Sequence, residues 1–185
     1  MLVTPDMETL RWSCLGWTIT GESCLEGESK RRSNVLISRE EGVILRDIRL
    51  KGLSGEFSLV KHIQFTDWSN YGVVEEVEDL VGLVRRVERE WGQLEGPLVV
   101  YCEGGLGRTG TFTTVLSLYL ALRTAVLTSN MSTVENHLGK EEDLMLTGLV
   151  MELRRVRHPW MVEGIHQYLL AYRALLQLLR RILSD

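Results

Sequence analysis

The sequence contains few cysteines, and their spacing excludes the common metal frameworks. The 185 residues include three of them, Cys14, Cys24 and Cys102. Cys14 and Cys24 have no nearby Cys-x-x-Cys or histidine partner, so we expect neither to bind zinc. We therefore expect no metal site, and only Cys102 lies in a segment that suggests chemistry.

The sequence also lacks an excess of basic residues. Lysine and arginine total 21 against 25 for aspartate and glutamate, which gives a formal net charge of −4. A protein that binds nucleic acid through its phosphates depends on a net basic surface. We therefore expect no nucleic-acid partner.

Long apolar runs and export signals are missing as well. The longest apolar region, Val115–Leu127, is interrupted by polar side chains and is shorter than the ~20 residues needed to span a bilayer. Residues 1–12 have neither a basic start nor an apolar stretch, unlike a secretory signal. We expect no membrane span and a cytoplasmic location.

The remaining composition fits one soluble globular domain. Hydrophobic residues make up 44% of the chain and charged residues 25%, and no repeat or low-complexity linker divides it. Residues 1–32 show a weak pattern with several charged and glycine-containing stretches, so we expect an irregular or partly ordered segment there. We place the folded domain at residues 33–185.

Hydrophobic periodicity predicts an α/β fold with a helical C-terminal part. Short runs of branched and aromatic residues predict strands at 34–38, 43–50 and 57–65. The apolar run Leu98–Tyr101 predicts a strand that is covered on both faces. Helical spacing predicts helices at 75–91, 111–127, 140–157 and 162–183.

The chemistry is concentrated between the strand at 98–101 and the helix that follows it. Cys102 ends the strand and faces the positive end of a helix, a setting that lowers the pKa of a thiol and favours a nucleophilic thiolate. Glycines at 104, 105 and 107 let successive backbone N–H groups converge on an anion such as phosphate. The Arg108 guanidinium can donate hydrogen bonds to two phosphate oxygens at once, and the Thr109 hydroxyl can donate a hydrogen bond to the Cys102 sulfur.

This segment, Val100-Tyr101-Cys102-Glu103-Gly104-Gly105-Leu106-Gly107-Arg108-Thr109-Gly110, resembles the C-x5-R-[ST]-G signature of the cysteine-dependent protein-tyrosine phosphatases. The resemblance implies a metal-independent phosphatase without a cofactor, acting on phosphotyrosine in proteins or peptides. It assigns catalysis to Cys102, Arg108 and Thr109, and phosphate binding to the loop 103–108. A plain strand-turn-helix glycine loop would not explain the cysteine, arginine and threonine together.

Two further segments support the resemblance. Residues 60–73, with Trp68, Ser69 and Asn70, resemble the family's strand and mobile Trp-Pro-Asp loop, which closes over bound phosphotyrosine. Residues 153–168 resemble the glutamine-containing loop, in which Gln167 would position water for the second step. The resemblance implies a twisted, mostly parallel central sheet flanked by helices, with the phosphate cradle at the C-terminal end of strand 98–101.

The sequence departs from the family at positions that matter for the reaction. Asn70 matches the aspartate that protonates the leaving phenolate, and an amide cannot replace that acid. Tyr101 replaces a histidine, and Glu163 stands where the first glutamine is usual. The carboxylates considered as substitutes for the missing acid are those of Asp67, Glu75 and Glu76.

Three functions therefore remain open. The first is a protein-tyrosine phosphatase with reduced activity, and the second is a pseudophosphatase that binds phosphotyrosyl proteins or regulates another phosphatase. The third is another C-x5-R enzyme, such as a dual-specificity phosphatase or a rhodanese, against which the Trp68 and Gln167 segments argue. We expect His62 and His166 to be packing or surface residues, and Arg154, Arg155 and Arg157 to form a solvated helix face. The resemblance alternatively places Arg157 near the rim of the active site, where it would meet an acidic peptide.

Overall fold

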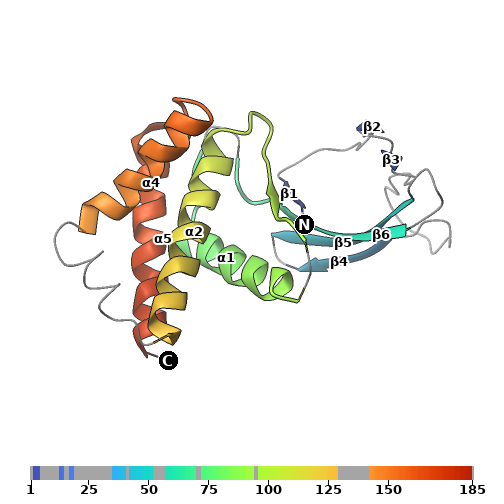
Figure 1. The fold of residues 1–185 in the computed structure, drawn as a ribbon, viewed down its shortest axis with the longest axis horizontal. Coiled ribbons are helices and arrows are strands. Elements are labelled where there is room, and N and C mark those ends of the chain that lie inside the picture. The colour runs from blue at the N-terminus through green and yellow to red at the C-terminus, as the bar shows by residue number, and fades with distance from the viewer. Residues whose placement is uncertain are drawn as a thin grey trace. The chain divides into compact units, whose positions relative to one another are not determined.

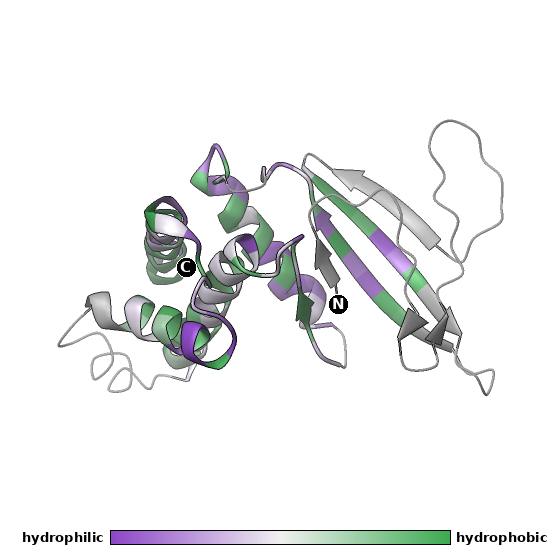
Figure 2. Ribbon diagram, turned by 90° about the horizontal axis from the view of Figure 1, so that it is seen from above, coloured by the Kyte–Doolittle hydropathy of each residue, from purple (hydrophilic) through white to green (hydrophobic). Residues whose placement is uncertain are grey.

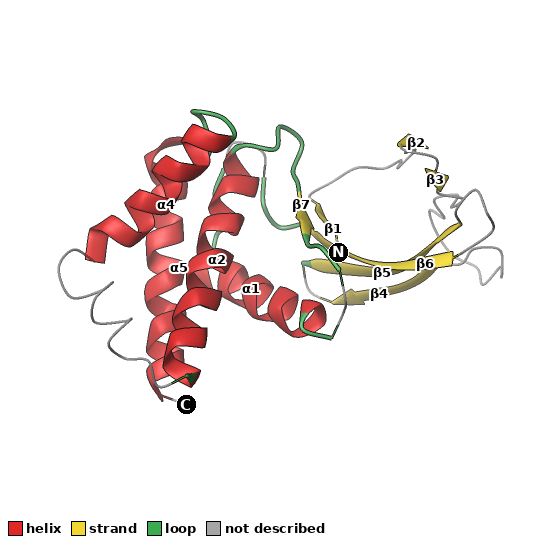
Figure 3. Cartoon of the chain, viewed as in Figure 1, coloured by secondary structure: helices red, strands yellow, loops and turns green. Residues whose placement is uncertain are grey.

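The computed structural model describes residues 2–4, 13–14, 17–18, 35–40, 42–51, 57–69, 72–93, 96–128 and 142–184. The chain divides into two compact units. The first unit comprises residues 1–67 and 95–103, and the second comprises residues 68–94 and 104–185. Strands occupy the first unit and helices the second (Figure 3).

Three long strands form the body of the first unit. They are β4 (Val35–Glu40), β5 (Val43–Lys51) and β6 (Phe57–Phe65). β5 lies between the other two and is antiparallel to both (Figure 1). These strands confirm the three predicted from branched and aromatic runs, because such residues suit an extended, pleated backbone.

Shorter strands extend this sheet on the other side of β6. β1 (Leu2–Thr4) pairs in parallel with β6 and with β7 (Val99–Val100). On the opposite side, β2 (Ser13–Cys14) and β3 (Trp17–Thr18) form an antiparallel pair, and β3 joins β5. A mostly parallel sheet is thus not confirmed, because the longest ladders are antiparallel. That helices flank the sheet stays a prediction.

β7 differs from the strand predicted at 98–101. Among the described residues it pairs with β1 alone, and Val99 is 46% exposed. The prediction of a strand covered on both faces is therefore wrong. An unbroken apolar run is consistent with full burial, but it does not say how many neighbours the strand acquires.

A polar cluster interrupts the apolar residues of β5 and β6, whose hydrophilic and hydrophobic bands alternate in Figure 2. Arg46 donates from Nη1 to Gln64 Oε1 over 2.7 Å, and the same nitrogen lies 3.3 Å from His62 Nδ1. Burial, assisted by the positive charge of Arg46, lowers the pKa of His62 to about 4. His62 is a packing residue, as predicted.

The described residues of the second unit form four helices that pack together. They are α1 (Val77–Trp91), α2 (Gly107–Leu127), α4 (Glu142–Val156) and α5 (Gly164–Ser184). α2 packs along α5 and also touches α1 and α4 (Figure 1). The predicted helices are confirmed, with ends that differ by a few residues except at the start of α2. The buried face of α1 comprises Leu80, Val81, Leu83, Val84 and Val87.

α2 is the central helix of this unit. It begins at Gly107, whereas the sequence predicted a start at Thr111, because the glycine-rich segment was assigned wholly to a loop. By length and composition α2 is apolar enough to cross a membrane, but 50% of its apolar window is buried inside the structure. The core helix of a soluble protein has these same properties, and its contacts with three other helices agree with that role.

Candidate active site

The loop before α2 presents backbone N–H groups rather than side chains at the start of the helix. Gly105 has φ +65°, a conformation that favours glycine, and the helix begins two residues later. The N-cap residue, Leu106, provides no side-chain cap for the first N–H groups. These donors and the positive end of the helix dipole suit an anion, as the sequence predicted for Gly104, Gly105, Leu106 and Gly107.

Arg108 is buried at the first turn of α2, where a charged side chain is rare without partners. Its Nη1 donates a hydrogen bond of 2.9 Å to the backbone carbonyl oxygen of Trp68. The structure therefore brings together the predicted phosphate-binding arginine and the first residue of the predicted mobile loop. The neighbouring Thr109 hydroxyl is buried and has no hydrogen-bond partner among the described residues, so it remains available for its predicted role.

Trp68 and Ser69 are hydrogen-bonded to Gly72, and we call the described residues joined by these contacts the Trp68 turn. The indole Nε1 of buried Trp68 donates to the carbonyl of Gly72 over 3.0 Å, and Gly72 N–H donates to the carbonyl of Ser69 over 3.2 Å. A side chain at Gly72 would meet the Ser69 hydroxyl, so glycine leaves this hydroxyl in place where a larger residue would require it to rotate. Asn70 lies outside the described residues.

Gln167, on α5, is the centre of a buried hydrogen-bond network. Its Nε2 donates to the carbonyl of Gly72 over 3.2 Å, and its Oε1 accepts from the Glu163 N–H over 2.9 Å. The hydroxyl of Thr111 also donates to this Oε1, at 3.3 Å, and to the carbonyl of Gly107. One amide therefore connects the Trp68 turn, the start of α2 and the turn before α5. Its predicted role in positioning water stays a prediction.

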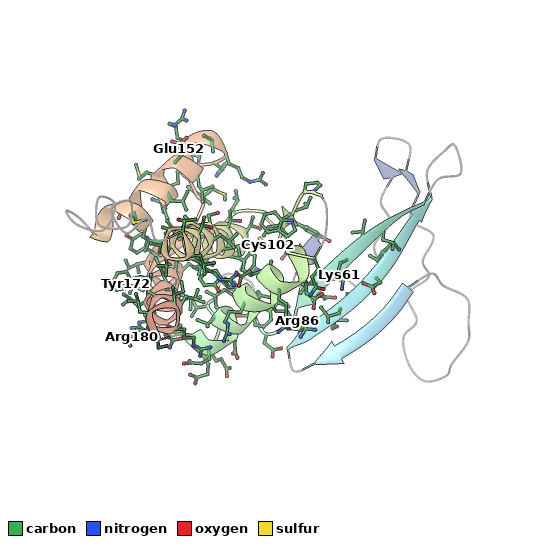
Figure 4. All side chains as sticks on the ribbon, turned by 60° about the horizontal axis from the view of Figure 1, so that its bottom comes forward. Lys61, Arg86, Cys102, Glu152, Tyr172 and Arg180 are labelled. Carbon is green, nitrogen blue, oxygen red and sulfur yellow. The ribbon has the colours of Figure 1, made fainter. Side chains whose placement is uncertain are left out.

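The predicted solvated arginine face is wrong for Arg154, which is half-buried, and holds for Arg155 and Arg157, which are exposed. Arg154 donates to the carbonyls of Met161 (2.9 Å) and Val162 (3.1 Å), which holds the turn before α5. Arg157 also donates from Nε to the carbonyl of Gly105 over 3.3 Å and so supports the anion loop. Arg155 forms an exposed pair with Glu152 on α4, which Figure 4 labels. A basic run by itself does not reveal which guanidinium meets a backbone carbonyl.

Cys102, labelled in Figure 4, and Glu103 belong to the first unit, where they follow β7 after Tyr101. Cys102 is buried and carries a reduced thiol, and Glu103 is exposed. The sequence places the sulfur six positions before Arg108, the spacing of the predicted signature. No group of three potential metal ligands occurs among the residues that the structure describes.

The carboxylates considered as replacements for the missing acid have other surroundings. Asp67 accepts a hydrogen bond of 2.9 Å from the Thr66 hydroxyl, and its carboxylate also lies against Gly42 in the turn between β4 and β5. Glu75 and Glu76 are exposed before α1.

The site and the comparisons with known proteins agree on the class. A family model described as protein-tyrosine phosphatase matches residues 31–177. The chain belongs to the protein-tyrosine phosphatase family.

Several receptor-type phosphatases are similar to it. The human receptor-type tyrosine-protein phosphatase F is 31% identical over 140 residues, and the protein of the same name from Danio rerio is 34% identical over 140 residues. Each match covers 74% of this chain and 6% of the relative. The human receptor-type tyrosine-protein phosphatase C is 35% identical over 118 residues, which is 64% of this chain and 8% of the relative. The chain thus spans a small part of the length of these relatives.

Proposed function

We propose that this protein hydrolyses phosphotyrosine in proteins or peptides through a phosphocysteine intermediate on Cys102. The observation that supports this most directly is the buried Arg108 beside an uncapped glycine loop, with its Nη1 on the carbonyl of Trp68. A buried guanidinium next to free backbone donors is suited to a phosphate group, which accepts hydrogen bonds from both.

In the proposed first step, the Cys102 thiolate attacks phosphorus and the bond to the tyrosine oxygen breaks. The N–H groups of residues 103–108 and the Arg108 guanidinium stabilise the charge on the phosphoryl oxygens. In the second step, water attacks the phosphocysteine and releases inorganic phosphate. The Thr109 hydroxyl then stabilises the departing thiolate, a role for which its unpaired buried oxygen is suited.

We propose that this activity is weak, since Asn70 occupies the position of the general acid. A positioned acid typically contributes about 10²- to 10⁴-fold to the rate. Without it, the tyrosine oxygen leaves as an unprotonated phenolate, so turnover falls most for leaving groups of high pKa.

The same departure favours a second candidate, a pseudophosphatase that binds phosphotyrosyl proteins or regulates another phosphatase. Such a protein retains the nucleophile and the arginine but does not complete turnover efficiently. For either function we propose a cytoplasmic location, because reducing conditions keep a nucleophilic thiol in its active form.

One experiment separates the two candidates: phosphate release from a phosphotyrosyl peptide by the parent protein, Asn70→Asp and Cys102→Ser. Turnover by the parent well above that of Cys102→Ser supports the enzyme. A parent that binds the peptide but releases no more phosphate than Cys102→Ser supports the pseudophosphatase, in particular when Asn70→Asp restores turnover.

A further inference from the structure

Glu163 lies against the start of α2. Its Cβ is 3.1 Å from the position that a Cβ on Gly107 would occupy, so glycine at 107 lets the Glu163 side chain approach the helix closely. The carboxyl carbon of Glu163 is two bonds beyond that Cβ. The side chain thus starts beside the residue that precedes Arg108, at the end of the helix where an anion is favoured.

The backbone at Glu163 is held from several sides. Its N–H donates to buried Gln167 Oε1 over 2.9 Å. The two preceding carbonyls, of Met161 and Val162, both accept hydrogen bonds from Arg154. Val162 is fully buried and has φ 59°, a left-handed conformation that a branched residue adopts only where its surroundings impose it. The position of the side chain is therefore fixed at its base.

The carboxylate of Glu163 has no protein partner that would explain it. The residue is half-buried, and among the described residues its side-chain oxygens accept no hydrogen bond and form no ion pair. A carboxylate beside a phosphate cradle repels the ligand unless it takes up a proton during the reaction. A purely structural role would require contacts that this side chain does not make.

We propose that Glu163 is the general base of the second chemical step, an inference that rests on the proposed phosphatase function. Its carboxylate accepts a proton from a water molecule while the water oxygen attacks phosphorus. The P–S bond to Cys102 breaks, the sulfur leaves as a thiolate, and the phosphoryl group is released as inorganic phosphate. Glu163 then returns the proton to solvent, so that water is the only co-reactant consumed.

With this assignment, Glu163 supplies a carboxylate for the second step in a chain whose residue at the general-acid position, Asn70, is an amide. Arg108 directly follows Gly107, against which Glu163 lies, and Arg154 binds the carbonyls of the two residues that precede Glu163.

The test follows phosphocysteine directly, with p-nitrophenyl phosphate as substrate, because its leaving group departs without protonation. Parent protein, Glu163→Gln and the control Glu152→Gln are mixed with substrate, quenched rapidly and analysed for phosphate on Cys102. Glutamine preserves the size of the side chain and leaves the backbone N–H bond to Gln167 in place. Glu152, exposed on α4, loses the same charge without any contact to the loop.

We expect decay of the phosphocysteine to slow by about 10²- to 10⁴-fold in Glu163→Gln, while its formation remains within a few-fold of the parent and the control is unchanged. Equal decay in parent and Glu163→Gln, or an equal slowing in the control Glu152→Gln, overturns the role of Glu163. Absence of phosphocysteine in every variant overturns the proposed phosphatase function itself, and this inference with it.

Discussion

Arg108 Nη1 lies 2.9 Å from the backbone carbonyl oxygen of Trp68, so the same guanidinium that is expected to bind phosphate also holds the first residue of the Trp68 turn. The relationship joins residues that are 40 positions apart in the sequence. Any substitution of Arg108 should therefore change both the bound phosphate and the turn.

Arg108→Lys should lower kcat/KM for a phosphotyrosyl peptide by about 10²- to 10³-fold, the usual cost of removing one transition-state donor. Lysine keeps the charge but loses the planar fork that binds two oxygens at once. Steady-state kinetics give the comparison, with Arg89→Lys on the exposed side of α1 as control. A loss of less than about tenfold would show that charge alone is sufficient at this position.

A pair of buried threonines on α2 should respond in opposite ways to replacement by valine. Thr114 is fully buried and its hydroxyl has no partner, so Thr114→Val should raise the free energy of unfolding by about 1 kcal/mol. Thr111 is equally buried but donates to Gly107 and Gln167, so Thr111→Val should lower it by about 1–3 kcal/mol. Urea unfolding measures both, and shifts of the same sign would contradict the contrast.

The glycines of the second unit offer another matched pair. A Cβ at Gly110 would lie 2.5 Å from the backbone nitrogen of Val162, which cannot move aside easily, so Gly110→Ala should destabilise the protein by about 1–3 kcal/mol. Gly82, in the middle of exposed α1 surface, has open space around it, and Gly82→Ala should stabilise by about 0.5–1 kcal/mol. Thermal unfolding of the two variants beside the parent provides the measurement.

Stability should depend on the protonation of His62. The pKa of His62 is lowered from 6.5 to about 4, so the unfolded chain takes up this proton before the folded one does. The contribution of neutral His62 to the free energy of unfolding is complete above pH 6.5 and is lost as pH falls towards 4. It amounts to roughly 3 kcal/mol across that window. The difference in unfolding free energy between parent and His62→Gln, measured from pH 7.5 to 4, should therefore change with pH. A constant difference would show that His62 does not titrate in this way.

Asn70→Asp should restore decay of the phosphocysteine by at least about tenfold in a Glu163→Gln background, because a second carboxylate can then accept the proton. Rapid-quench measurement of the double variant beside Glu163→Gln gives the answer. If the two decay at the same rate, an aspartate at position 70 does not reach the attacking water.

Local patterns in the sequence predicted much of this fold and less of its site. β5 and β6 follow from local runs of branched and aromatic residues, and α1 follows from helical spacing, and a single segment specifies each of these patterns. The start of α2 at Gly107 was missed, since glycine is assigned to loops unless a close neighbour is known, and that neighbour, Gln167, is distant in sequence. The partial burial of Arg154 was not predicted for the same reason, because its carbonyl partners are defined by tertiary structure.

The backbone of the turn before α5 is held by other residues: Arg154 binds the two carbonyls that precede Glu163, and Gln167 binds its N–H. The side chain at 163 contributes nothing to this support. Evolution can therefore exchange the residue at this position, and with it the chemistry of the reaction, without first redesigning the loop. The same independence lets substitutions at position 163 test the proposed chemistry without disturbing the support of this turn.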